Sequence, residues 1–189
     1  MAQAQTIVPN LWFNGVAKEA VDFYTSIFPG GVINSTEYYP GSADEGLADF
    51  QQGLASKVLM VDFSLGGQQF MAINAGPEFS PNQTISFFVY FNTTRTATPR
   101  EGLDALWEKL IDGGEALMEL GDYPFSEHYG WVRDKYGYTW QLMLTPSEGE
   151  TREMIVPSLL FTSATGLKAE EALNYYASVF KDSKQGHFE

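Results

Sequence analysis

Cysteine is absent from the 189 residues of this chain, which excludes a disulfide framework and thiolate metal or redox chemistry. Histidine is scarce, since His128 and His187 are the only two. Basic residues number 11 against 24 acidic ones, which gives a formal net charge of −13. Because nucleic acids and anionic membranes are bound by clustered Lys and Arg, this charge argues against both as partners.

Long apolar runs and targeting segments are missing as well. No apolar run reaches about 18 residues, the length of a membrane-spanning helix, and the first five residues lack the basic and apolar regions of a signal peptide. The default expectation is therefore a cytoplasmic protein. Phosphate loops, nucleophile elbows and glycine-rich dinucleotide turns are also absent. S-adenosylmethionine is usually held at such a glycine-rich turn, so methyl transfer would lack its ordinary site.

The sequence contains ample material for a folded core. Hydrophobic residues make up 44% of the chain and aromatic residues 15%, so we expect disorder only at the ends. A length of 189 residues suits one domain, or one domain with a partial second one. The acidic net charge suits a cationic ligand, and it equally suits a surface that simply keeps the protein soluble.

A strand-helix segment near the N-terminus recurs near the C-terminus. Ile7–Phe13 is echoed by Ile155–Phe161, and Lys18–Phe28 is echoed by Glu170–Phe180. An internal repeat constrains the architecture before any residue is given a role, and here about 120 residues separate the two copies.

The residues up to the second copy follow one order of elements twice. Hydrophobic periodicity predicts a strand, a helix and three strands in residues 6–74, and the same series in residues 83–145. Thr98 and Glu101 form a capping box at the start of the second helix. We therefore expect two paired βαβββ modules in residues 1–148 and a partial third module, a strand plus a helix, in residues 149–189.

The partial third module would leave apolar surface without a partner. A helix stripe of Leu173, Tyr176 and Phe180 has no strands of its own module to cover it. An unfinished sheet also has an open edge. We expect residues 154–180 to pack onto the body of the protein or onto a second chain.

Four stretches, which cover about residues 7–145, carry a resemblance to a known family. They are Leu11–Phe13 together with Ala20–Phe28, then Gly67–Phe79, Ile85–Val89 and Gly130–Gln141. With the tandem βαβββ order they resemble the vicinal oxygen chelate superfamily, which includes glyoxalase I, extradiol dioxygenases and the fosfomycin- and bleomycin-resistance proteins. The chain is most similar to the PhnB-like branch, whose members often carry the label 3-demethylubiquinone-9 3-methyltransferase.

The resemblance implies an α+β fold in which two modules pair their sheets into a curved, half-open barrel around a cleft. It implies that the site lies in this cleft, commonly on a divalent metal held by His, Glu or Gln. It also implies a homodimer, because in many members the cleft forms or closes only when modules of two chains pair.

The usual metal ligands are not found in this chain. Relatives that bind metal typically place a Glu in the pattern Asp-x-x-Gly-x-x-x-Glu-Leu, and the matching run Asp134–Leu142 has Gln141 in its place. A neutral amide is a poor ligand for a hard cation, and the first strands offer no His. We therefore expect no cofactor; a divalent metal would need an atypical set such as Gln141, His128 and a carboxylate. Asp134 itself is assigned to the hairpin turn.

Gln141 is the first candidate for a ligand-binding residue, because its amide would lie inside the cleft. Asn74 holds a loosely comparable place at the end of the first module's last strand. His128, beside Glu127, is a weak candidate for a general base. The alternative roles are structural: an amide bonded within the sheet, a turn asparagine and a histidine at the rim.

Aromatic residues alternate along the predicted strands, so some of them must face the concave side, where they could stack on a planar ligand. Core packing is the alternative for each. Acidic residues in the long loop after Pro40 either attract a cation, close over a ligand or are simply solvated. The aromatic candidates are Trp12, Tyr90, Trp131 and Trp140, with Phe13 and Phe87, and the acidic ones are Asp44, Glu45 and Asp49.

These observations favour a metal-independent protein that binds a small cationic or planar molecule and acts as a homodimer. One alternative is a metal-dependent enzyme of the lyase, dioxygenase or transferase type with an atypical ligand set. Another is an interaction module that dimerises through its strand-helix segment. The sequence does not identify a ligand or a substrate.

Overall fold

The computed structural model describes residues 7–146, 153–162, 168–181 and residue 183. One series of elements, strand, helix and three strands, occurs twice in it. The first series comprises β1 (Asn10–Phe13), α1 (Ala17–Ile27), β2 (Val32–Tyr38), β3 (Val58–Leu65) and β4 (Gln68–Asn74). The second comprises β5 (Ile85–Phe91), α2 (Pro99–Ile111), β6 (Glu115–Tyr123), β7 (Ser126–Arg133) and β8 (Thr139–Leu144).

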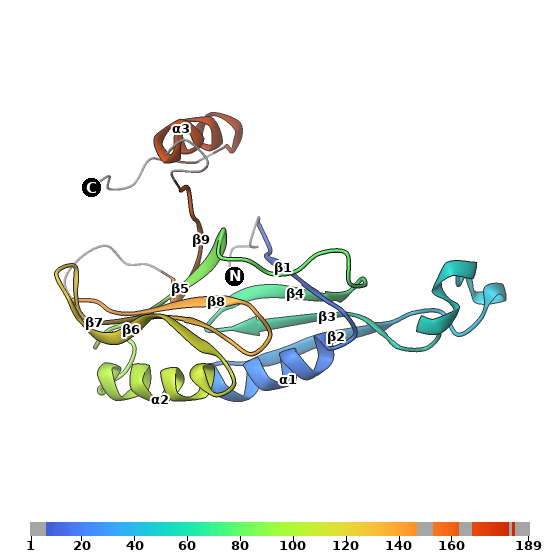
Figure 1. Cartoon of the computed structure of the whole chain (residues 1–189), viewed down its shortest axis with the longest axis horizontal. Helices are drawn as coiled ribbons and strands as arrows, with labels where there is room; N and C mark the ends of the chain where they lie inside the picture. The colour runs from blue at the N-terminus through green and yellow to red at the C-terminus, as the bar shows by residue number, and fades with distance from the viewer. Residues whose placement is uncertain (1–6, 147–152, 163–167, 182, 184–189) are drawn as a thin grey trace.

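Each series forms its own mixed sheet. The first sheet has the order β1-β4-β3-β2, and the second has the order β6-β7-β8-β5-β9. In both sheets the first strand of the series runs parallel to the last one, while the hairpin strands are antiparallel. Helices α1 and α2 run along the same side of the two sheets, and the described residues form no such layer on the opposite side (Figure 1). This arrangement confirms the predicted α+β class and the glyoxalase/bleomycin-resistance-like fold.

The helix-covered side contains the core. Along β3 the buried residues alternate as Val61, Phe63 and Leu65, each fully buried against α1, as expected for a strand with one face in the core. Helix α1 contributes Ala17, Ala20, Val21 and Tyr24 at helical spacing. The same arrangement holds in the second sheet, where the buried face of α2 is Leu103, Leu106, Trp107 and Leu110.

Aromatic rings join the two sheets into one core. Phe70 of β4 meets Phe87 of β5 with ring centroids 5.3 Å apart. The ring centroid of Phe28, which follows α1, lies 4.7 Å from that of Trp140 of β8. These edge and tilted contacts are the preferred geometries of aromatic pairs, and they connect residues far apart in the chain.

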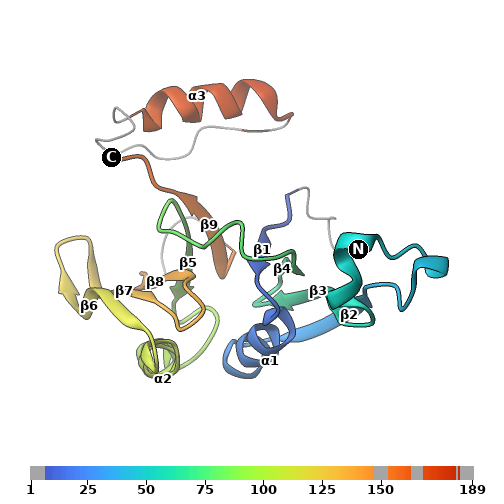
Figure 2. The same cartoon turned by 45° about the vertical axis from the view of Figure 1, so that its right-hand side comes forward.

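The C-terminal segment has one packed and one unpacked part. Strand β9 (Ile155–Leu159) pairs antiparallel with β5, with Ile155 opposite Val89. Ile155 is fully buried, so β9 belongs to the core of the second sheet. Helix α3 (Ala169–Val179) contains no buried residue, and it stands apart from both sheets (Figure 2).

Two further predictions from the sequence concern the helices. The predicted capping box of α2 is not formed, because the N-cap residue Thr98 makes no side-chain capping bond; Pro99 does occupy the first turn. None of the helices described by the structure has the length and apolarity that crossing a membrane requires.

Candidate functional site

The side of the second sheet that lacks a helix, called here the open face, places Gln141 among aromatic residues. Gln141 of β8 lies opposite Phe88 of β5 and opposite Trp131 of β7. Residues directly opposite each other in neighbouring strands share a face of the sheet. Met143, two residues along β8, lies opposite Tyr90 and Tyr129 on the same face.

The Gln141 amide is held by two hydrogen bonds. The Tyr129 hydroxyl donates to Oε1 at 2.6 Å, and Nε2 donates to the Ser86 hydroxyl at 2.7 Å. Burial raises the pKa of Tyr129 to about 12, so its hydroxyl keeps the proton that it donates. An amide has two N–H groups and two lone pairs on its oxygen. The two bonds therefore fix the orientation of Gln141 and leave one donor and one acceptor position for a ligand.

Trp131 lies beside Gln141 and has an unsatisfied polar group. Its indole N–H is buried, and no described residue accepts a hydrogen bond from it. A buried donor without an acceptor costs about 1–3 kcal/mol. A bound water or a ligand oxygen or nitrogen would remove this cost, so the side chain favours a partner that carries an acceptor.

Phe88 and Tyr90 extend the aromatic surface of the open face along β5. Their rings stack in parallel with centroids 5.6 Å apart. With Trp131 and Met143 they surround the Gln141 amide with apolar surface. A few polar groups set in an apolar lining are typical of small-molecule sites.

Trp12 lies on the first sheet, on the side where the described residues form no helix. It is opposite Ile73 of β4, while its neighbours Leu11 and Phe13 are buried on the helix side. Its indole N–H donates to the Gly76 carbonyl at 2.8 Å, and the Phe79 ring packs edge-on against it at 5.0 Å. Trp12 therefore does not belong to the group around Gln141.

Trp140, a predicted ligand-binding residue, lies in the core. It is adjacent to Gln141 on β8, so its side chain points to the helix side, where it is fully buried. Its indole N–H donates to the Asp134 carboxylate at 2.8 Å, and its ring packs on Phe28 and Phe87. This placement matches the alternative role, core packing.

Asn74, also predicted to bind a ligand, instead connects α1 to the first sheet. Its Oδ1 accepts the backbone N–H of Ala17, the first residue of α1, at 2.9 Å. Its Nδ2 donates to the Val58 carbonyl at 2.9 Å. The amide thereby satisfies one of the free N–H groups at the helix start, on the side of the sheet away from the open face.

His128 lies on the helix side of β7. Its Nε2 is 2.6 Å from the Asp104 carboxylate of α2, and its Nδ1 is buried with no hydrogen-bond partner among the described residues. The acid that it contacts is thus Asp104 rather than the neighbouring Glu127. His128 and Gln141 lie on opposite faces of the second sheet, so they cannot bind one metal ion together.

The described residues do not fit a divalent metal. They contain no group of three His, Cys, Asp or Glu side chains placed to hold one, whereas metal sites need about three convergent ligands. His187 lies outside the described residues. The acidic loop residues lie in two short 3₁₀ segments, Ala43–Glu45 and Asp49–Leu54, which project beyond the end of the first sheet (Figure 1).

Sequence reasoning missed Ser86, Phe88, Tyr129 and Met143, which complete the surroundings of Gln141. The alternation of side chains along a strand could have found Met143, which is two residues from Gln141 on β8. Ser86 and Phe88 on β5 and Tyr129 on β7 could not be found in this way, because they face Gln141 only through the register between strands.

Comparisons with known proteins identify the family and agree with the fold. Residues 5–143 match the family model described as 3-demethylubiquinone-9 3-methyltransferase. A solved structure from Bacillus cereus, described as a putative 3-demethylubiquinone-9 3-methyltransferase, PhnB protein, is 36% identical. The match covers 75% of this chain and 100% of that one, with a TM-score of 0.61. A Pseudomonas aeruginosa protein of solved structure is 22% identical over 76% of this chain and 100% of its own, with a TM-score of 0.57. A search of curated proteins finds no match.

Proposed function

The chain belongs to the 3-demethylubiquinone-9 3-methyltransferase family, PhnB-like proteins of the vicinal oxygen chelate superfamily, and from this we propose that it binds a small planar molecule on the open face of its second sheet without using a metal. The observation that carries the proposal is the pairing of Gln141 with Trp131. One residue offers a fixed amide with spare hydrogen-bonding capacity, and the other offers an indole N–H that lacks an acceptor among the described residues.

The chemistry of the ligand can be inferred from these groups. Aromatic side chains favour a flat ring system that can stack or meet them edge-on. The Trp131 N–H and the remaining Gln141 N–H both favour an acceptor on the ligand, such as a carbonyl oxygen or a ring nitrogen. We therefore propose a planar heteroaromatic or quinone-like compound, and the acidic net charge of −13 makes a cationic form acceptable.

A metal-dependent enzyme is less well supported. The atypical ligand set that would hold a metal needs His128 and Gln141 to converge, and these two side chains lie on opposite faces of β7 and β8. The methyl transfer in the family's description would need a place for its donor. The loop from β1 to α1, Asn14–Val16, is not the glycine-rich turn on which that donor is usually bound.

The proposal also includes a homodimer, in the cytoplasm, with residues 149–189 as the beginning of a third module. Tyr24 and Phe28 of the first copy are 0% and 3% exposed. Their counterparts in the later copy, Tyr176 and Phe180, are 42% and 44% exposed. An apolar helix face of this kind is typical of a surface that packs against another chain.

The binding proposal is tested by titrating the protein with 1,4-naphthoquinone, whose carbonyl oxygens accept hydrogen bonds, while recording tryptophan fluorescence. We expect Gln141→Leu and Trp131→Phe each to weaken binding by about tenfold, the cost of one lost buried hydrogen bond. Trp12→Phe is the matched control, because Trp12 lies on the other sheet. Equal affinities of the unmodified protein and its three variants, with unchanged melting temperatures, would refute the open-face site.

A further inference from the structure

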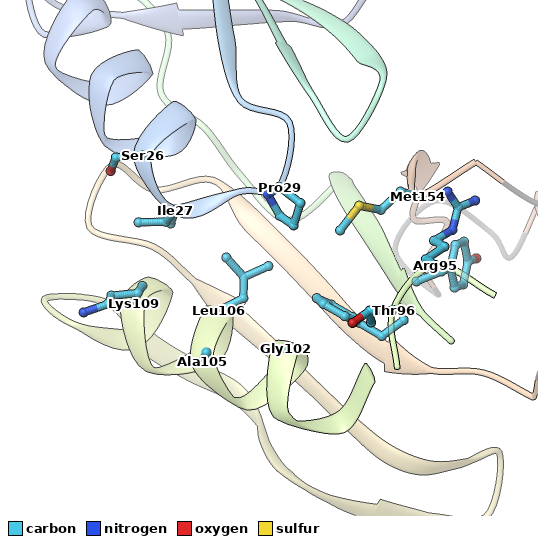
Figure 3. A pocket seen from close by; sticks show the side chains of 12 residues that line it. Ser26, Ile27, Pro29, Arg95, Thr96, Gly102, Ala105, Leu106, Lys109 and Met154 are labelled. Carbon is cyan, nitrogen blue, oxygen red and sulfur yellow. The ribbon is translucent and has the colours of Figure 1, made fainter. Parts of the chain in front are cut away.

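A cavity lies on the helix-covered side of the molecule, between the end of α1 and the face of α2. Its volume is 460 Å³, within the range of about 300–1,000 Å³ that is usual for small-molecule sites. The side chains that line it come from both series of elements and from the residue before β9 (Figure 3). We call this cavity the helix groove.

The wall of the helix groove is mostly apolar. Ile27 and Pro29 contribute from the end of α1, Leu106 from α2, and Met154 from the segment before β9. Space for a ligand arises at Gly102 and Ala105, which present little or no side chain on the same face of α2. A hydrocarbon chain or ring would be removed from water here, which is favourable by about 25 cal/mol per Å² of apolar surface.

Two charged residues are found among the described residues that line the groove, and both are basic. Lys109 lies at one end and Arg95 at the other, with Leu106 between them (Figure 3). No Asp or Glu is among the described residues that line it, although the whole chain carries 24 acidic and 11 basic residues. The charged side chains among the described lining are therefore of the sign that favours an anion over a cation.

We propose that the helix groove binds an elongated amphipathic carboxylate, with its apolar body against Leu106 and Met154 and its carboxylate paired with Lys109 or Arg95. This site is separate from the open face, which lies on the other side of the sheets and suits a planar acceptor. Tyr90 borders both, so it is not a suitable residue for telling them apart.

The proposal is tested with sodium decanoate by isothermal titration calorimetry on the full chain. Decanol and decyltrimethylammonium serve as probes that share its apolar chain and differ in charge. We expect decanoate to bind more tightly than either, and its affinity to fall as salt is raised. Lys109→Gln and Arg95→Gln should each weaken it about threefold to fivefold, as for a solvent-exposed ion pair, and Ala105→Leu should block it by filling the groove.

The control variant is Lys57→Gln, an exposed lysine in the β2–β3 segment away from the groove, which should leave decanoate binding unchanged. Melting temperatures within a few degrees of the unmodified protein establish that each variant is folded. Decanoate that binds no better than decanol would overturn the proposal. So would full affinity in the Lys109→Gln, Arg95→Gln double variant. Loss of decanoate binding in Gln141→Leu alone would place the molecule on the open face instead and also overturn it.

Discussion

The carboxylate of Asp134 accepts four hydrogen bonds at the centre of the contact between the two series of elements. Its Oδ2 receives the Tyr24 hydroxyl at 2.7 Å and the Trp140 indole N–H at 2.8 Å. Its Oδ1 receives the backbone N–H groups of Tyr136 and Tyr138. The turn role expected from sequence is present in the last two bonds. The bond from Tyr24 adds a connection to α1, more than 100 residues away in the chain.

Asp134→Asn should destabilise the fold strongly. One acceptor oxygen becomes an NH₂ group that faces donors, so buried bonds are lost and donors are left unpaired. We expect a loss of about 2–4 kcal/mol in the free energy of unfolding, measured by urea denaturation. Asp112→Asn, at an exposed position after α2, should change it by less than about 0.5 kcal/mol. Similar values for the two variants would show that Asp134 is not a central contact.

Burial of Asp134 also gives a pH dependence with a definite sign. Burial raises the pKa of this carboxyl above its usual 3.8, although the four donors oppose that shift. The folded state therefore binds the proton more tightly than the unfolded state does. The stability of the unmodified protein relative to Asp134→Asn should be greatest at acid pH and fall as the pH rises from about 4 through the raised pKa. A difference that grows with pH would mean that the donors outweigh burial.

At the level of whole elements, the start of α1 depends on a side chain from β4. The Ala17 N–H donates to Asn74, and Asn74 donates to Val58, so one amide ties the helix to two strands. Asn74→Ala should cost about 1–3 kcal/mol of stability, the sum of a lost cap and an unpaired carbonyl. Asn10→Ala, at an exposed position of β1, is the matched control.

The Asn74 variant also separates a structural role from a ligand-binding one. Thermal denaturation should show the lower stability, while naphthoquinone titration below the melting temperature should give the affinity of the unmodified protein. If Asn74→Ala instead lost naphthoquinone affinity at full stability, the assignment to the helix start would be wrong.

The order of elements was predictable because it depends on local patterns. Helical spacing in α1, alternation in β3 and the glycine turns between strands are properties of short segments. The faces of the strands were not predictable in the same way. Trp131 and Trp140 are similar residues on adjacent strands, yet Trp131 lies opposite Gln141 and Trp140 lies opposite Val132. Their faces therefore depend on the hairpin register, which is a tertiary property.

Contacts between distant segments escaped sequence reasoning for the same reason. The partner of His128 is Asp104 on a helix 24 residues earlier, and the partner of Asn74 is a backbone N–H 57 residues earlier. The sequence shows that a side chain can form hydrogen bonds, but it does not show whether the partner is a ligand or a helix. In the structure the Asn74 amide bonds the helix start and a strand, and the Nε2 of His128 contacts Asp104, so both are engaged by segments that the sequence does not place beside them.

For the whole molecule, the central question is how the repeated C-terminal segment takes part in the fold. Strand β9 covers the edge of β5 and buries Ile155, whereas α3 buries none of its described residues within the chain. The same kind of helix, α1, is buried against a sheet in the first copy. The two parts of the segment should therefore respond differently to removal.

Two truncations test this difference. Ending the chain after Glu153 removes β9, exposes the β5 edge and takes Ile155 out of the core, so we expect a loss of at least about 3 kcal/mol in unfolding free energy or outright aggregation. Ending it after Thr162 removes only α3 and its flanking residues. This smaller truncation should leave the melting temperature of the monomer unchanged while sedimentation equilibrium shows a dimer converted to a monomer. A stable protein after the first truncation would refute the role of β9. An unchanged oligomeric state after the second would refute α3 as the dimer contact. It would show that the exposed Tyr176 and Phe180 are not covered by a partner chain in the full-length protein.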